Sequence, residues 1–149
     1  MLRLRLADPR DGSGIRALLE LNGLPTSDLA SSRPEFVVAE EEGGLVGAGA
    51  LERFGAAALL RSVVVAADRR GTGVGQRIVG ELEQRARAAG VRELVLLTQT
   101  AAPFFAHYGY RTVERGKVSA AVQASAEFRS ICPTSATCMV KALIEPVTT

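Results

Sequence analysis

The sequence predicts an α/β domain with a mixed sheet, on three observations. Residues 1–6 alternate between apolar and polar side chains, which is typical of a half-buried strand. The glycine pair at residues 43 and 44 separates two strand-like segments and favours a tight antiparallel hairpin. Further along, a strand-like run, a glycine-rich turn and a helix-like segment follow one another, which is typical of parallel strands. We therefore expect antiparallel strands followed by strand, helix, strand, helix and strand, in one domain over residues 1–149.

The boundaries of these elements follow from capping and breaking residues. Asp11 precedes a helix whose apolar positions share one face, and Gly23 ends that helix. A later helix repeats an apolar residue every four positions from Val74 to Ala86, and Gly90 ends it. The expected strands cover residues 1–6, 35–41, 45–54, 58–65, 93–97, 110–113 and 136–143, and the later helices or helical turns cover residues 76–89, 101–108 and 118–128.

Composition and charge argue against several classes of function. The 18 Lys and Arg residues barely exceed the 16 Asp and Glu residues and are scattered, so no nucleic-acid surface is expected. No apolar stretch approaches the roughly 20 residues that span a bilayer, and the first residues do not form a signal peptide. The sequence therefore predicts a soluble, cytoplasmic protein without a membrane partner.

The two cysteines, Cys132 and Cys138, are expected to be reduced, since the chain is expected to lie inside the cell. Their spacing matches no common zinc site, so no metal is expected. Burial as small apolar side chains is the favoured interpretation, and binding of zinc or trivalent arsenic by the thiolates is the alternative.

A glycine-rich turn is the most informative motif. It consists of Arg70, Gly71, Thr72, Gly73, Val74 and Gly75. The glycines keep Cβ atoms away, so backbone NH groups can approach an anion, and the NH groups at the start of the following helix favour that anion. Because an arginine adds a positive charge beside them, the turn predicts a phosphate-binding site.

Two common phosphate-binding motifs are excluded. A Walker loop needs Gly-Lys-Ser/Thr where this chain has Gly75, Gln76 and Arg77. A dinucleotide fingerprint needs a third small residue where this chain has Gln76 or Ile78. Nucleotide hydrolysis and dinucleotide binding are therefore not expected.

The pattern Arg-x-x-Gly-x-Gly after the strand that contains Val63 and Val65 resembles the pyrophosphate-binding signature of the GNAT superfamily of acetyl-CoA-dependent N-acetyltransferases. The resemblance covers almost the whole chain. It implies the GNAT fold, with antiparallel N-terminal strands and a splayed central parallel pair, and it implies acetyl-CoA as co-substrate. The carrier-binding residues that it implies are Val63, Val65, Arg70, Gly71, Gly73, Val74, Gly75, Gln76, Thr98 and Phe105.

Acetyl transfer needs a neutral amine, stabilisation of the carbonyl oxygen and a leaving group. The resemblance implies that the backbone NH of Val65 polarises the thioester carbonyl. Glu52 is the predicted base, directly or through a water, and a solvated surface charge is the alternative. The family's usual tyrosine is replaced by Phe105, but a thiol pKa of about 8.5 lets coenzyme A leave as a thiolate. Tyr108 and Tyr110 are the alternative proton donors.

The predicted substrate-binding residues are Glu52, Arg61 and Ser62. Arg61 interrupts an apolar strand, where a guanidinium needs a partner, and a carboxylate or arsonate-like group of the substrate would be one. The alternative is a surface charge.

A second resemblance concerns the acceptor. It is similarity to the arsenic-resistance N-acetyltransferases of the ArsN type, over residues 51–52, 59–62, 96–98, 104–105, 109–110, 128, 131–136 and 139. This likeness implies a small amino acid bearing a phosphinate or arsenic-containing acid group. An ordinary amino acid, a protein N-terminus and a non-catalytic acyl-CoA sensor are the alternatives. Homodimers are common in the superfamily, so a homodimer is the assembly to test.

Overall fold

The computed structural model describes residues 1–131 and 135–143 and contains one seven-stranded sheet with the order β1-β2-β3-β4-β5-β7-β6. Its strands are β1 (Arg3–Leu6), β2 (Glu35–Glu41), β3 (Gly44–Phe54), β4 (Ala57–Val65), β5 (Glu93–Thr98), β6 (Arg111–Thr112) and β7 (Thr137–Ala142). Every neighbouring pair is antiparallel except β4 and β5, which are parallel. The predicted mixed α/β sheet is confirmed.

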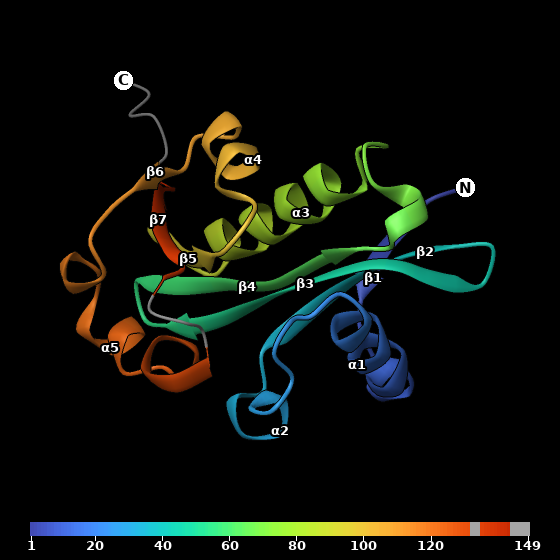
Figure 1. Ribbon diagram of the computed structural model, residues 1–149, viewed down its shortest axis with the longest axis horizontal. Helices are drawn as coiled ribbons and strands as arrows, with labels where there is room; N and C mark the ends of the chain where they lie inside the picture. Colours follow the sequence, from blue (N-terminus) through green and yellow to red (C-terminus); the bar gives the residue numbers. More distant parts are fainter. Residues whose placement is uncertain (132–134, 144–149) are drawn as a thin grey trace.

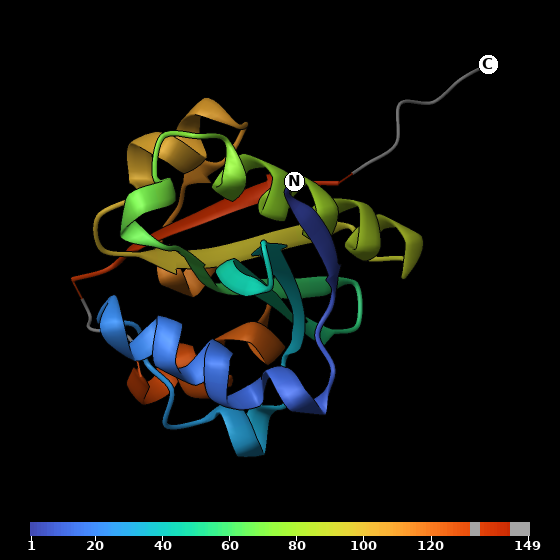
Figure 2. The same cartoon turned by 90° about the vertical axis from the view of Figure 1, so that its right-hand side faces the viewer.

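Helices cover both faces of this sheet (Figures 1 and 2). They are α1 (Gly12–Leu21), α2 (Leu29–Ser32), α3 (Val74–Ala88), α4 (Ala102–His107) and α5 (Ala120–Gln123), with short helical turns η1 (Pro9–Asp11), η2 (Ala67–Arg69), η3 (Arg115–Lys117) and η4 (Glu127–Ile131). Helices α3 and α4 lie on one face, and α1, α2 and α5 lie on the other. The two faces have separate apolar cores, because successive residues of a strand point to opposite sides.

Helix α3 lies directly on β3. A Cβ atom at Gly49 would come within 2.8 Å of Ile78 and 2.9 Å of Leu82, so only glycine allows this approach. Both of those α3 side chains are fully buried. This close packing sets the height of α3 above the sheet and therefore the position of its first turn.

The parallel pairing of β4 and β5 is short. It joins three residue pairs, Ala57 with Glu93, Ala58 with Leu94 and Leu59 with Val95. Among the described residues, β4 beyond Leu59 pairs only with β3, while β5 continues to pair with β7. The two central strands therefore separate toward their carboxyl ends, as the family resemblance implied.

Three local predictions differ from the structure. The β2–β3 turn is centred on Glu42 and Gly43, both with positive φ (51° and 82°), and not on residues 43 and 44. Helix α3 begins at Val74, two residues earlier than expected. The expected helix over residues 118–128 is divided between α5 and the start of η4, and its interruption at Ser125 coincides with hydrogen bonds that this residue makes to the next turn.

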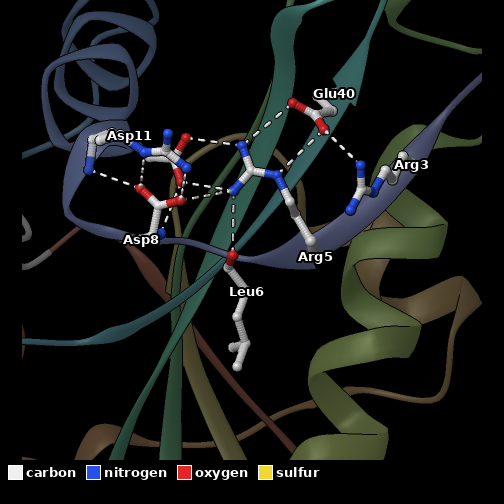
Figure 3. Close-up of polar contacts among 7 residues, drawn as sticks. Arg3, Arg5, Leu6, Asp8, Asp11 and Glu40 are labelled. Atoms are coloured by element: carbon white, nitrogen blue, oxygen red, sulfur yellow. Dashed lines mark hydrogen bonds and ion pairs between the residues drawn. The ribbon is translucent and has the colours of Figure 1, made fainter.

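A cluster of charged residues fastens β1 to its neighbours (Figure 3). The guanidinium of Arg5 donates to both carboxylate oxygens of Asp11, at 2.8 and 3.0 Å, and to Glu40 on β2, at 3.3 Å. Asp11 also accepts a hydrogen bond from the backbone NH of Asp8 at 2.8 Å. Asp11, the predicted N-cap residue of α1, therefore makes no capping hydrogen bond with its side chain to α1. Its carboxylate instead links the start of α1 to β1.

We predict that Asp11→Asn destabilises the protein at neutral pH by about 1–2 kcal/mol, because it removes charged hydrogen bonds. The hydrogen bonds from Arg5 lower the pKa of Asp11 to about 2. A lowered carboxyl pKa stabilises the folded state above the unfolded pKa of about 3.9, and this contribution is lost as the pH falls toward the folded value. The difference in melting temperature should therefore be present at pH 7 and shrink between pH 4 and 2. Thermal unfolding over a pH series checks this, with the exposed Asp68→Asn as control. An equal difference at both ends of the series would contradict it.

Candidate active site

The glycine-rich turn presents an open helix start. Gly71 and Gly73 have φ values of 79° and 90°, a left-handed conformation that favours glycine. The backbone NH of Arg77 donates to the carbonyl of Gly73 at 3.1 Å. The NH groups of the three residues between them, 74–76, precede the first helical hydrogen bond and point out of the helix start. A Cβ at either positive-φ glycine would meet nothing within 4 Å, so this side of the turn is accessible, and it suits an anionic group.

Arg70 joins this turn to two other elements. Its guanidinium donates to the side-chain oxygen of Asn22, at the end of α1, and to the carbonyl of Val65 at 3.4 Å. The Arg70 side chain remains exposed, so its charge is available beside the helix start. The predicted phosphate-binding residues are therefore brought together at the end of β4.

A β-bulge interrupts β4 just before this end. Ala50 pairs with Arg61 and Ala48 with Val64, so Gly49 on β3 faces two residues of β4, Ser62 and Val63. Ser62 has a φ of 56°, in the left-handed region that serine rarely adopts. Such a bulge rotates the following backbone relative to the sheet.

The bulge and the separation of the central strands act on the same backbone segment. Residues 60–65 have a paired edge toward β3 and an edge toward the gap between β4 and β5. The NH groups of residues two apart point to the same edge of a strand. The predicted pair of donors, Val63 and Val65, satisfies this spacing, and their role toward a carrier stays a prediction.

Arg61 is the centre of a buried polar cluster. Its side chain has no exposed surface and forms a two-pronged ion pair with Asp28, with N–O distances of 2.5 and 2.7 Å. It also donates to Glu52 at 3.1 Å and to the hydroxyl of Ser62 at 3.2 Å. Burial by itself lowers the pKa of Arg61, but the hydrogen bonds of Asp28 and the charge of Glu127 outweigh it, so the pKa lies above its usual value.

The same ion pair acts on the carboxylate. The hydrogen bonds from Arg61 hold the pKa of Asp28 below its usual value, and Ser32 donates to this carboxylate at 2.6 Å. The cluster therefore links α2, β3 and β4 through charged hydrogen bonds, which are stronger than neutral ones.

Sequence reasoning identified three members of this cluster and missed Asp28. The prediction that Arg61 needs a partner is satisfied inside the chain, and its binding of a substrate anion stays a prediction. Asp28 lies 33 residues away in a short polar segment, so no local spacing pointed to it.

The predicted carrier-binding residues beyond the turn have other contacts. Thr98 ends β5, and its hydroxyl accepts a hydrogen bond from the NH of Ala101 at 3.0 Å, which shapes the turn into α4. Phe105 is buried in the core, with its ring centre 5.5 Å from that of Tyr110. Phe104, which was not predicted, lies 3.6 Å from the position of a Cβ at Gly75. Carrier contacts of Thr98 and Phe105 stay predictions, and Phe104 lies beside the first turn of α3.

Tyr110 is not available as the alternative proton donor. Its hydroxyl donates to Glu83 on α3 at 2.8 Å, and Lys141 donates to the same carboxylate at 3.0 and 3.1 Å. Burial, with the charge of Glu83, raises the pKa of Tyr110 well above its usual value. Tyr108, half-buried beside Phe104, is the tyrosine that keeps this alternative open.

The remaining expectations concern metals, thiols and membranes. Cys138 is buried as predicted, and burial raises its thiol pKa, whereas Cys132 lies outside the described residues. Within residues 1–131 and 135–143, no three His, Cys, Asp or Glu side chains are grouped so that they could hold a metal ion. Over the same residues, no helix has the length and apolar character needed to cross a membrane.

Comparison with solved structures finds the same fold in other proteins. The Mycobacterium tuberculosis protein Rv2747, solved with CoA, has a TM-score of 0.82 and 26% identity over 95% of this chain and 99% of its own. N-acetylglutamate synthase from Neisseria gonorrhoeae, solved with coenzyme A and N-acetyl-glutamate, has a TM-score of 0.80 and 21% identity over 97% of this chain and 36% of its own. Both of those proteins were thus solved with coenzyme A bound.

Sequence comparison gives a shorter match and a family. N-alpha-acetyltransferase 80 from Mus musculus is 46% identical over 56 residues, which are 38% of this chain and 18% of that protein. The chain thus spans less than a fifth of that relative's length. The sequence profile described as "Acetyltransferase (GNAT) domain" matches residues 32–112, more than half of the chain. The chain therefore belongs to the GNAT acetyltransferase family.

Proposed function

We propose that this protein transfers the acetyl group of acetyl-CoA to the primary amine of a small, amino-acid-like substrate by direct attack. The observation that carries the proposal is the early separation of β4 and β5 next to the open start of α3. The NH groups at the start of α3 support binding of a pyrophosphate. The edge of β4 beyond Leu59, which has no partner strand among the described residues, supports hydrogen bonding to a thioester carbonyl.

The proposed chemistry assigns one task to each part. Arg70 and the NH groups at the start of α3 hold the pyrophosphate, while Val63 and Val65 bind the pantetheine arm and the carbonyl oxygen through their backbone NH groups. Glu52, directly or through a water, takes the proton from the substrate ammonium. The amine nitrogen then forms the C–N bond, the C–S bond breaks, coenzyme A leaves as a thiolate, and the nitrogen loses its second proton to water.

Arg61 acts in this scheme through its neighbours. Its hydrogen bonds to Glu52 and Ser62 place the base and the bulge relative to each other, and Asp28 holds the guanidinium in place. Direct binding of the substrate's acid group by Arg61 or Ser62 is the competing role. This role requires the guanidinium of Arg61 to give up, or to share with the substrate, its hydrogen bonds to Asp28, Glu52 or Ser62.

The identity of the acceptor is the finer part of the proposal. The ArsN-type likeness supports an amino acid with a phosphinate or arsenic-containing acid group. The 46% identity with an N-alpha-acetyltransferase over 56 residues supports a second candidate, a protein N-terminus. A non-catalytic acyl-CoA sensor is the third. A cytoplasmic location and a homodimer remain part of the proposal.

Release of thiol from acetyl-CoA tests the function. With a panel of glutamate, phosphinate and arsenical amino acids and an N-terminal peptide, we expect thiol release with at least one amine. Gly73→Ala should raise the KM for acetyl-CoA about tenfold, because a Cβ at a φ of 90° costs about 1–3 kcal/mol and deforms the turn. Gly80→Ala, on the open side of the same helix, is the control. Binding of acetyl-CoA without thiol release for any amine would favour the sensor.

We predict that Glu52→Gln lowers kcat about 100-fold or more, since a positioned base contributes at least this much. In the variant, kcat should follow the fraction of acceptor amine that is already deprotonated and therefore rise with pH, because no carboxylate accepts the ammonium proton. The KM for acetyl-CoA should not change. Steady-state kinetics over a pH series check this, with the exposed Glu20→Gln as matched control. If the variant keeps the pH profile of the wild-type protein, Glu52 is not the base.

Variants of the ion pair separate the two roles of Arg61. If Arg61 positions Glu52 and Ser62, then Arg61→Lys and Asp28→Asn should both lower kcat and leave the KM for the acceptor nearly unchanged. If Arg61 binds the substrate, Arg61→Lys should raise that KM, and Asp28→Asn should not. Loss of one partner of a buried pair costs about 3–5 kcal/mol, so kinetics are compared only below each variant's melting transition.

A further inference from the structure

A cavity of about 530 Å³ lies between the end of α2 and the end of β3. Its volume is within the range of small-molecule sites, about 300–1,000 Å³. It is lined by Ser32, Arg33, Glu35, Leu51, Glu52, Arg53 and Phe54. The cavity is distinct from the glycine-rich turn, and Glu52, the proposed base, is one of its lining residues.

The charged groups of this cavity differ in what they contact. Arg53 is paired with Glu35 at 3.1 Å. Glu52 keeps 12% of its side chain exposed and gives one carboxylate oxygen to Arg61. The guanidinium of Arg33 is exposed and makes no hydrogen bond or ion pair with any residue in the described part of the chain. Apart from the pair of Arg53 and Glu35, the cavity thus offers one unneutralised cation, Arg33, and the carboxylate of Glu52.

The two walls of the cavity are held together by the buried cluster. Ser32, on the α2 wall, donates to Asp28, which is paired with Arg61, and Arg61 donates to Glu52 on the β3 wall. Each of these contacts is 3.1 Å or shorter. The positions of the α2 and β3 walls are therefore set before any ligand binds, which lowers the entropy cost of binding.

We infer that this cavity is the acceptor site and that it takes a free α-amino acid, with its amine at Glu52 and its carboxylate at Arg33. The inference rests on the proposed function, since Glu52 serves there as the base. A zwitterion matches one cation and one carboxylate in charge, and a guanidinium binds a carboxylate through two parallel hydrogen bonds. A peptide N-terminus has an amide in place of the carboxylate and leaves the guanidinium unmatched.

The structure also suggests how to remove this charge with little effect on the fold. Arg33 closes α2 in a left-handed conformation with a φ of 47°, and its NH donates to Leu29 at 3.1 Å. Asparagine adopts this conformation readily, so Arg33→Asn keeps the backbone while removing the guanidinium. Arg92→Asn, at an exposed arginine before β5, is the matched control.

The experiment compares L-alanine with L-alaninamide and L-glutamate with L-glutamic acid α-amide as acceptors, in the intact protein. We expect the free acids to have the lower KM, and Arg33→Asn to raise it about 10- to 100-fold, since a charged hydrogen bond is lost. The KM for the amides and for acetyl-CoA should change no more than in Arg92→Asn. Equal use of acid and amide, or an equal effect of the two substitutions, would overturn the inference while leaving the proposed function intact.

Binding without catalysis separates this inference from the proposed function. Backbone amide shifts are followed as L-alanine and L-glutamate are added to the ¹⁵N-labelled protein. Shifts at residues 32–35 and 51–54 that disappear in Arg33→Asn support the site even if no thiol is released. The absence of thiol release would then contradict only the proposed acetyl transfer. Shifts elsewhere, or none with either amino acid, overturn the site.

Discussion

The buried guanidinium of Arg61 is the constraint on which the proposed acceptor side of this protein depends. A charge without exposed surface is tolerated only when it is paired and hydrogen-bonded. Asp28 supplies the pairing from the segment before α2, and Glu52 supplies a further acceptor from β3. Meeting this requirement holds three elements in one arrangement, and that arrangement forms a wall of the adjoining cavity. The contacts that stabilise the charge are thus the same ones that place the proposed base.

The proposed carrier side depends on a different requirement: backbone NH and C=O groups need hydrogen-bond partners. The central strands β4 and β5 share three residue pairs. Beyond these pairs, the described residues of β5 pair with β7 and not with β4. The later part of β4 keeps one edge for hydrogen bonds outside the sheet, and the NH groups at the start of α3 likewise precede the helical pattern. Glycine at residue 49 brings α3 close to the sheet, so these two sets of backbone donors lie at the same end of β4.

The proposed acceptor and carrier sides meet at Ser62. The bulge at this residue lies between the buried Arg61 cluster and the edge of β4 that faces away from β3. Ser62 accepts a hydrogen bond from Arg61 through its hydroxyl, and its left-handed φ of 56° turns the following residues relative to the sheet. A residue held in this conformation costs of order 1–3 kcal/mol and persists when its surroundings over-determine it. The hydrogen bond from Arg61 is one part of those surroundings.

The sequence by itself determined what is local. Alternation, the glycine turn and the four-residue apolar repeat were enough to predict the mixed sheet, the start of α3 to within two residues and the place of the anion-binding backbone. These features depend on φ preferences and on side-chain period, which a short segment carries alone.

The tertiary structure decided everything that depends on distant partners. Asp28 as the partner of Arg61 and the burial of Tyr110 against Glu83 have no signal in local spacing, because each contact joins residues 27 or more positions apart. The same is true of the bulge at Ser62, which exists only relative to its neighbour strand β3. Local patterns were therefore enough to predict the proposed donor side of the reaction, while the proposed acceptor side depends on long-range pairing of charges.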